Sequence, residues 1–397
     1  MLSLSMIVRD EAPRLERCLE SVAGFVDEMV VVDTGSMDAT VTVAERWGAQ
    51  VHRIEWPGDF APARNQALRW VRGNWVLTLD ADEWLLPGAR EPLRQLMEQP
   101  DALVINLLRY EQGAKQSPYS SVSRLFRRHP AIHWSRPYHA MVDDSVTALL
   151  QQEPHWHILQ WPEPALAHEG YRADRIAGAN KAARLRHAME ADLRAHPGDP
   201  YASAKLGGLE LIEGHLTRAV TLLEKGLAHC PSDAHAQRYE LTLHLAMAYG
   251  GTNTTKAIAL YQKALALPLD PRLTLAARLN LAALMVNTGQ LQAAAEHCTE
   301  ATRLAPEVAL GWYNLGLIHR QLGDLPNAIA SYQRAIHLDP DHAEAHQNLA
   351  VACLMAGDIA AARQGFRHAI ALLLHQGHHD QAEALRRRAG AMIKLEG

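Results

Sequence analysis

The chain has 397 residues, of which 48% are hydrophobic and 21% charged, and its formal net charge is −5 at pH 7. This length allows two or three domains, each with its own core. The slightly acidic balance excludes a global attraction to nucleic acid or acidic membranes, and no apolar stretch approaches the roughly 18–20 residues of a membrane-spanning helix. The 4 cysteines are widely spaced and form no CxxC pair. We therefore expect reduced thiols in a cytoplasmic protein, without a disulfide framework or zinc site.

The first half of the chain alternates short apolar runs with amphipathic stretches. Residues 3–8 predict a strand rather than a signal peptide, because they lack a basic segment and a cleavage site. The further elements expected in chain order are a helix over 11–22, a strand over 29–32, a helix over 38–47, a strand over 49–54, a helix over 62–72 and a strand over 75–79. Strands that alternate with helices predict an α/β domain with a largely parallel sheet.

Polar side chains follow three of these strands. Right-handed crossovers place the carboxyl ends of parallel strands along one edge of the sheet, where ligands of open α/β sheets bind. The residues at these ends are Asp10 and Glu11 after the first strand, Asp33, Thr34 and Ser36 after the second, and Asp80 and Asp82 after the fourth. Their recurrence along one edge predicts a ligand site, since the helical faces already supply charge for solubility.

The turn Asp80-Ala81-Asp82-Glu83 follows the buried run over 75–79. Residues i and i+2 of an extended chain point to the same face, so the two aspartates can converge on one ion. Paired carboxylates suit Mg²⁺ or Mn²⁺, which would in turn hold a diphosphate. The alternative is a solvated acidic turn that closes a strand, and these residues alone support both interpretations equally.

From about residue 197 the pattern is all-helical and periodic. Small residues recur about 34 positions apart, as at Ala282, Gly316 and Ala350, and a proline follows the second helix of several copies. This is the tetratricopeptide pattern, and five repeats predict about ten helices stacked into a solenoid with a concave face. Residues 381–395 are expected to form a polar capping helix.

These patterns predict three segments. A first domain covers residues 1–172, and a helical connector rich in alanine, arginine and leucine covers residues 173–196. A tetratricopeptide domain of about five repeats and a capping helix covers residues 197–397.

Six ordered motifs lie in the first domain, at residues 5–11, 27–40, 60–65, 75–83, 123–127 and 168–171. With these motifs the domain resembles family 2 glycosyltransferases of the GT-A fold. It is most similar to the bacterial branch in which tetratricopeptide repeats follow the transferase domain, a branch that includes the peptide S-glycosyltransferases of glycocin biosynthesis. As a set, the six motifs are far more specific than a lone D-x-D.

The resemblance implies that the ends of the first two strands bind the nucleoside of a UDP-sugar. Asp33 would accept the N–H of uracil in a charge-assisted hydrogen bond, and Thr34 and Ser36 would offer hydroxyls. Asp10 and Glu11 would lie beside the nucleoside. From position alone, Asp33 could instead begin a turn, and the other two acids could be the charged start of a helix.

The resemblance also implies a divalent cation, Mn²⁺ or Mg²⁺, which stabilises the leaving nucleoside diphosphate as a Lewis acid. Asp80 would lie near the ribose and the metal, and Asp82 would be the firmer metal ligand. His168 would complete the cation shell or contact phosphate, and a core or loop histidine is the alternative. Arg64 would bind the diphosphate, although its position alone favours a surface arginine on an amphipathic helix.

One stretch departs from the family pattern. Family members often carry an acid after the histidine of the segment Tyr138-His139-Ala140-Met141, where this chain has Ala140. An inverting transfer needs a base near the acceptor nucleophile. The candidates are His139, Asp143 and Asp144, and the sequence does not choose between them.

The leading hypothesis is an inverting, metal-dependent glycosyltransferase that uses a UDP-sugar. The tetratricopeptide solenoid would hold a protein or peptide acceptor or mediate homodimerisation. The alternative is a tetratricopeptide scaffold with an inactive first domain, which Ala140 favours and the intact acidic and basic set opposes. A nucleotidyltransferase ranks last, because no glycine-rich loop follows the first strand.

Overall fold

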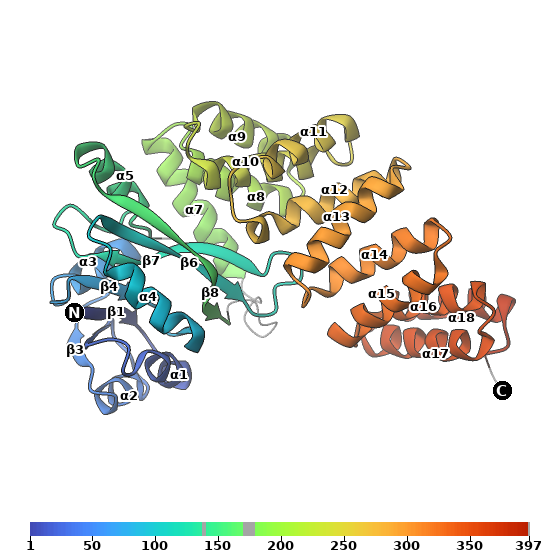
Figure 1. Cartoon of the computed structure of the whole chain (residues 1–397), viewed down its shortest axis with the longest axis horizontal. Helices are drawn as coiled ribbons and strands as arrows, with labels where there is room; N and C mark the ends of the chain where they lie inside the picture. Colours follow the sequence, from blue (N-terminus) through green and yellow to red (C-terminus); the bar gives the residue numbers. More distant parts are fainter. Residues whose placement is uncertain (137–139, 170–178, 396–397) are drawn as a thin grey trace. The chain divides into compact units, whose positions relative to one another are not determined.

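The structure, a computed structural model, describes residues 1–136, 140–169 and 179–395 (Figure 1). It divides into two compact units, the first made of residues 1–114 and 118–202 and the second of residues 115–117 and 203–397. Within the described ranges, no helix is both long and apolar enough to cross a membrane.

The first unit is built on a mixed sheet whose strands, in the described part of the chain, follow the order β3-β2-β1-β4-β7-β6-β8-β5. The strands are β1 (Leu2–Val8), β2 (Glu28–Asp33), β3 (Gln50–Arg53), β4 (Trp75–Thr78), β5 (Glu83–Leu85), β6 (Ala102–Glu111), β7 (Tyr119–Arg127) and β8 (His157–His168). Strands β1 to β4 run parallel, as the sequence predicts. Strand β7 is antiparallel to β4 and β6, β8 is parallel to β6, and β5 is antiparallel to β8.

The helices of the first unit cover this sheet. They are α1 (Ala12–Val22), α2 (Thr40–Arg46), α3 (Phe60–Ala67), α4 (Arg90–Met97), α5 (Asp143–Gln152) and α7 (Ala179–Ala195). Helix α2 begins at Thr40, two residues later than expected, and Asp38 lies before it and accepts the N–H of Thr40. Helix α3 ends at Ala67 rather than near residue 72, and a turn leads from it into β4. The first part of the expected connector lies outside the described residues, and α7 covers the rest.

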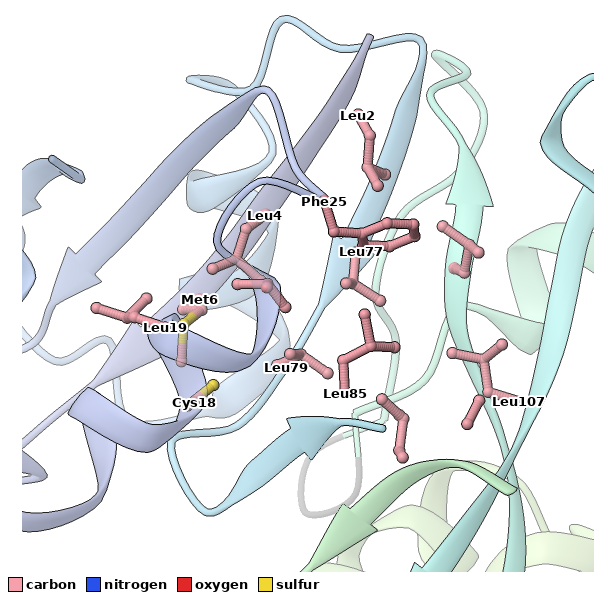
Figure 2. Close-up of a cluster of buried hydrophobic side chains, with 14 of the residues drawn as sticks. Leu2, Leu4, Met6, Cys18, Leu19, Phe25, Leu77, Leu79, Leu85 and Leu107 are labelled. Atoms are coloured by element: carbon pink, nitrogen blue, oxygen red, sulfur yellow. The ribbon is translucent and has the colours of Figure 1, made fainter. Parts of the chain in front are cut away.

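Both faces of the sheet are apolar, which is typical of parallel strands between helices. On one face, Leu2, Leu4 and Met6 of β1 pack with Cys18 and Leu19 of α1 (Figure 2). On the other face, Val30 and Val32 of β2 lie in a second cluster with Val76 of β4. Burying each large apolar side chain contributes about 1.5–3 kcal/mol. This packing fixes the level at which the parallel strands end.

The second unit is all-helical. Its helices are α8 (Pro200–Ile212), α9 (Leu216–His229), α10 (His235–Tyr249), α11 (Thr254–Leu265), α12 (Leu275–Asn287), α13 (Leu291–Leu304), α14 (Ala309–Gln321), α15 (Leu325–Leu338), α16 (Ala343–Met355), α17 (Ile359–His375) and α18 (His379–Met392). Helix pairs are joined by tight turns, and the turn glycines, such as Gly289 and Gly323, have positive φ. The all-α solenoid of the sequence prediction is confirmed.

Small residues allow the paired helices to approach closely. A Cβ atom added at Gly316 of α14 would lie 2.7 Å from the ring of Tyr332 in α15, whose side chain is fully buried. A Cβ atom added at Gly390, in α18, meets no atom within 4 Å. The two helical glycines therefore differ in whether a neighbouring helix packs against the Cα atom.

We expect Gly316→Ala to destabilise the second unit by about 1–3 kcal/mol, because the added methyl group overpacks the helix pair. Gly390→Ala is the matched control and should stabilise by about 0.5–1 kcal/mol through helix propensity. Urea denaturation followed by circular dichroism measures both. A Gly316→Ala protein as stable as the Gly390→Ala protein would contradict this packing.

Candidate active site

The ends of β1 and β2 form one hydrogen-bonded loop pair. Asp33 is 3% exposed, and its carboxylate accepts the N–H groups of Ser36 at 3.1 Å and Gly35 at 3.4 Å. The hydroxyl of Thr34 donates to the carbonyl oxygen of Val8 at 3.1 Å. The residues expected at the nucleoside thus lie on a rigid loop, where Asp33 also holds the turn. Its contact with a base stays a prediction.

Asp10 and Glu11 join this loop from the end of β1. Asp10 adopts a left-handed backbone with φ of 53°, and its N–H donates to the Ser36 hydroxyl at 3.0 Å. Burial raises the pKa of Glu11, its partner Arg14 lowers it, and the charges of Asp82 and Asp80 raise it further. The acids at the ends of β1 and β4 are therefore close enough to repel each other.

Asp80, directly after β4, lies between two arginines. Its Oδ2 atom is 2.6 Å from Nη2 of Arg124, and its Oδ1 atom accepts a hydrogen bond from Arg64. Burial raises the pKa of Asp80, but the two guanidinium groups outweigh this effect and hold the pKa well below its usual range. Asp80 is therefore ionised and held in place by the arginines.

Arg64 is buried within α3, with 6% of its surface exposed. Its Nε and Nη1 atoms have no hydrogen-bond partner among the described residues. Its guanidinium carbon lies 4.8 Å from the ring centroid of Trp134. A buried guanidinium with two donor atoms that lack partners is suited to bind an anionic ligand.

Glu83 lies beneath the Asp80 turn with its side chain fully buried. It accepts the N–H of Asp80 at 2.9 Å and pairs with Arg109 and, at 3.2 Å, with Arg124. Arg109 also pairs with Glu111 at 2.8 Å. This buried carboxylate is tolerated because its two ion-pair partners are arginines.

His168 connects this chain of charges back to the turn. Its Nδ1 atom lies 2.6 Å from Oε2 of Glu111, and its Nε2 atom lies 3.6 Å from Oδ2 of Asp82. Burial lowers the pKa of His168, but Asp82 and Glu111 outweigh it and raise the pKa to about 9. Alternating charges thus form an open series whose two end members, Asp80 and Asp82, are joined only through the backbone of the turn. We call this series the charge ring: Asp80, Arg124, Glu83, Arg109, Glu111, His168 and Asp82.

Of the three predicted metal ligands, the structure brings Asp82 and His168 together. Asp80 lies two residues before Asp82 in the same turn, and Arg64 and Arg124 hold its two carboxylate oxygens. A carboxylate oxygen and an imidazole nitrogen 3.6 Å apart suit a cation bound at about 2.0–2.2 Å from each. The pair suits Mn²⁺ or Mg²⁺ once His168 loses the Nε2 proton that its raised pKa retains at neutral pH.

A second cluster of metal-ligating side chains lies in the second unit. Within the described ranges, Glu210, Glu213 and His215 are the three residues of this kind whose ligand atoms all lie within 4.8 Å of one another. Glu210 is fully buried and pairs with His215 at 2.7 Å and with Arg218 at 3.1 Å. These ion pairs explain the cluster without a metal.

The base candidates differ in their surroundings. His139 lies outside the described residues. Asp144 is held by Arg136 at 2.7 and 3.1 Å and by the Ser135 hydroxyl at 2.6 Å. Asp143 accepts one hydrogen bond from the Ser123 hydroxyl at 2.9 Å, and burial raises its pKa. Asp143 is therefore better suited to accept a proton than Asp144.

Sequence reasoning missed Arg109 and Glu111. They lie two residues apart near the end of β6, so they share one face of the strand. Two charges on one face of an otherwise apolar run are a weak signal of a buried ion-pair network. The partners of these charges come from β5, β7 and β8, which no local pattern identifies.

Residues 3–159 match the family model described as glycosyl transferase family 2, and residues 316–357 match a TPR repeat model. The chain is 44% identical over 392 residues to the TPR repeat-containing protein Synpcc7942_0270 of Synechococcus elongatus. The matched stretch covers 98% of this chain and 97% of that protein. The solved structure of MamA is 20% identical, with a TM-score of 0.36, and covers 44% of this chain and 97% of that chain.

Two further relatives have glycosyltransferase names. An uncharacterized glycosyltransferase of Rickettsia bellii is 30% identical over 136 residues, which span 32% of this chain and 46% of that protein. The SPbeta prophage-derived glycosyltransferase SunS of Bacillus subtilis is 30% identical over 83 residues, 20% of each chain. Both matches span less than half of the relative.

The fold and the matched domain define a glycosyltransferase. The chain belongs to the same family as the TPR repeat-containing protein of Synechococcus elongatus, and its residues 3–159 form a family 2 glycosyltransferase domain. The resemblance expected from the six motifs is confirmed.

The Asp144–Arg136 pair predicts a pH-dependent contribution to stability. Burial raises the pKa of Asp144, but hydrogen bonds and charge from Arg136 outweigh it and lower the pKa. Because the folded pKa lies below the unfolded value of about 3.9, the pair stabilises the fold above about pH 4 and loses this effect as the pH falls through the folded pKa. Asp144→Asn should therefore be less stable than the wild type at pH 7, and urea denaturation should show the deficit shrinking toward pH 3. A deficit independent of pH would contradict the ion pair.

Proposed function

We propose that this glycosyltransferase moves a sugar from a UDP-sugar to a protein or peptide acceptor in an inverting, metal-dependent reaction. The observation that carries the proposal is the pair of buried arginines, Arg64 and Arg124, gathered on Asp80 beside Asp82 and His168. Positive charge and cation ligands at one strand end suit a nucleoside diphosphate.

Arg64 would bind the donor diphosphate. Its unpartnered Nε and Nη1 donors are buried, and unpaired buried donors are costly unless a ligand accepts their hydrogen bonds. Arg124 would hold the carboxylate of Asp80 in place. In this proposal, the turn that carries Asp80 faces the nucleotide. The loop of Asp10, Asp33, Thr34 and Ser36 would hold the nucleoside.

Asp82 and His168 would hold Mn²⁺ or Mg²⁺. The bound cation would stabilise negative charge on the leaving nucleoside diphosphate. The protein's own contribution is to keep the two ligand atoms 3.6 Å apart on the turn and on β8.

Asp143 would act as the base that removes the proton from the acceptor nucleophile. Its pKa is raised and it accepts a hydrogen bond from the Ser123 hydroxyl, whereas Arg136 and Ser135 hold the carboxylate of Asp144. An acceptor peptide bound by the tetratricopeptide repeats is the partner we propose, by analogy with other helical-repeat proteins. Homodimerisation is the alternative role of the repeats.

The free, buried cysteines suit a reducing compartment, so we propose a cytoplasmic location.

Asp82→Asn should lower the rate of UDP-sugar hydrolysis at least about 100-fold in the presence of Mn²⁺, because it removes an anionic ligand of the cation. Release of UDP from a panel of UDP-sugars, followed by chromatography, measures this rate. Asp341→Asn, at an exposed aspartate of the second unit, is the control. Equal rates in the wild type and Asp82→Asn would contradict the cation site.

Asp143→Asn should lower kcat for transfer by about 10²–10⁴-fold, the range typical of a lost general base, with little change in the affinity for UDP. Asp144→Asn should lower kcat less, because Asp144 stabilises the loop rather than touching the acceptor. A larger loss in Asp144→Asn would reverse the assignment. Full activity in both variants would leave His139 as the base.

A further inference from the structure

We propose that Glu111 is a positioning residue of the donor site, which orients His168 so that its Nε2 atom faces the cation. The inference rests on the proposed function, because it concerns the same cation. None of the six motifs contains Glu111, and the residue lies on β6, outside the turn that carries Asp82.

The sheet places Glu111 and His168 side by side. In the parallel pair of β6 and β8, Glu111 is in register with His168, and the N–H of Gln112 donates to the His168 carbonyl oxygen at 2.9 Å. On the other side of β8, His168 is in register with Glu83 of β5. The backbone ladders therefore bring these three side chains to one level at the end of the strands.

The contact itself selects one ring nitrogen. The Nδ1 atom of His168 donates to Oε2 of Glu111 over 2.6 Å, and the Nε2 atom is left facing Oδ2 of Asp82 at 3.6 Å. A carboxylate that accepts the Nδ1–H of a metal-binding histidine fixes the ring orientation and the tautomer. Such partners typically change metal affinity about 10–100-fold when removed.

Glu111 is held independently of His168. It is 3% exposed, and its Oε1 atom accepts hydrogen bonds from Arg109 at 2.8 Å and from the Ser120 hydroxyl. Arg109 and Ser120 thus hold the carboxylate without help from His168, which is the property required of a positioning residue.

A purely structural role predicts a different outcome. If Glu111 only neutralises Arg109, its removal lowers stability and weakens the site whether or not His168 is present. If Glu111 acts through His168, its effect on cation binding disappears once the imidazole is gone, which a double-mutant cycle measures directly.

The test is a Mn²⁺ titration of the full chain followed by electron paramagnetic resonance, with UDP present throughout. Glu111→Leu should bind Mn²⁺ about 10–100-fold more weakly than the wild type. Glu111→Gln should rescue most of this loss, because its amide oxygen still accepts the Nδ1–H. In a His168→Ala background, Glu111→Leu should cause no further loss. Glu98→Gln, at an exposed glutamate after α4, is the control.

Equal weakening in Glu111→Gln and Glu111→Leu, or an undiminished effect in the His168→Ala background, would overturn the inference while the cation site stands. A wild type that binds no Mn²⁺ would instead contradict the metal part of the proposed function, and the inference with it. If Glu111→Leu does not fold, the Arg109→Met/Glu111→Leu protein replaces it in the same cycle, since it also removes the buried cation that has lost one of its two carboxylate partners.

Discussion

The candidate active site of this glycosyltransferase depends on the pairing of buried charges beneath the Asp80–Asp82 turn. An unpaired charge in the interior costs several kcal/mol, so each member of the charge ring requires its neighbours. The ring draws on β5, β6, β7 and β8 as well as the turn after β4. The antiparallel half of the sheet therefore holds in place the residues that the parallel half presents at its edge.

This arrangement explains why one acidic turn contains two different aspartates. Asp80 is fixed by Arg64 and Arg124 and stays ionised, whereas Asp82 faces the imidazole of His168. A carboxylate already paired with two guanidinium groups is a poor metal ligand but a stable neighbour for a nucleotide. The second aspartate and the histidine remain as the cation ligands of the proposed function.

The local pattern of the sequence predicts most of the fold. Continuous apolar runs indicate β1, β2 and β4, the helical stripe of Leu15, Cys18 and Leu19 indicates α1, and the repeat spacing indicates the solenoid. The pairing order β4-β7-β6-β8-β5 was beyond this pattern, because the partners are distant in sequence and periodicity describes only one segment at a time. The ends of both α2 and α3 were misplaced. Helix α2 begins only at Thr40, whereas α3 begins early at Phe60, where Asp59 caps it, and ends in a turn after Ala67.

The motifs predict which residues lie at the site but not how their environments differ. Asp143 and Asp144 are neighbours of identical chemistry, but Arg136 pairs with Asp144 while burial raises the pKa of Asp143. In the same way, Glu111 becomes recognisable only when the sheet pairs it with His168.

The most direct measurement is anomalous X-ray diffraction from crystals grown with UDP and Mn²⁺. The account predicts a manganese peak within coordination distance of Asp82 and His168, with the diphosphate beside Arg64. A manganese peak at Glu210, Glu213 and His215 with none beside Asp82 would contradict it.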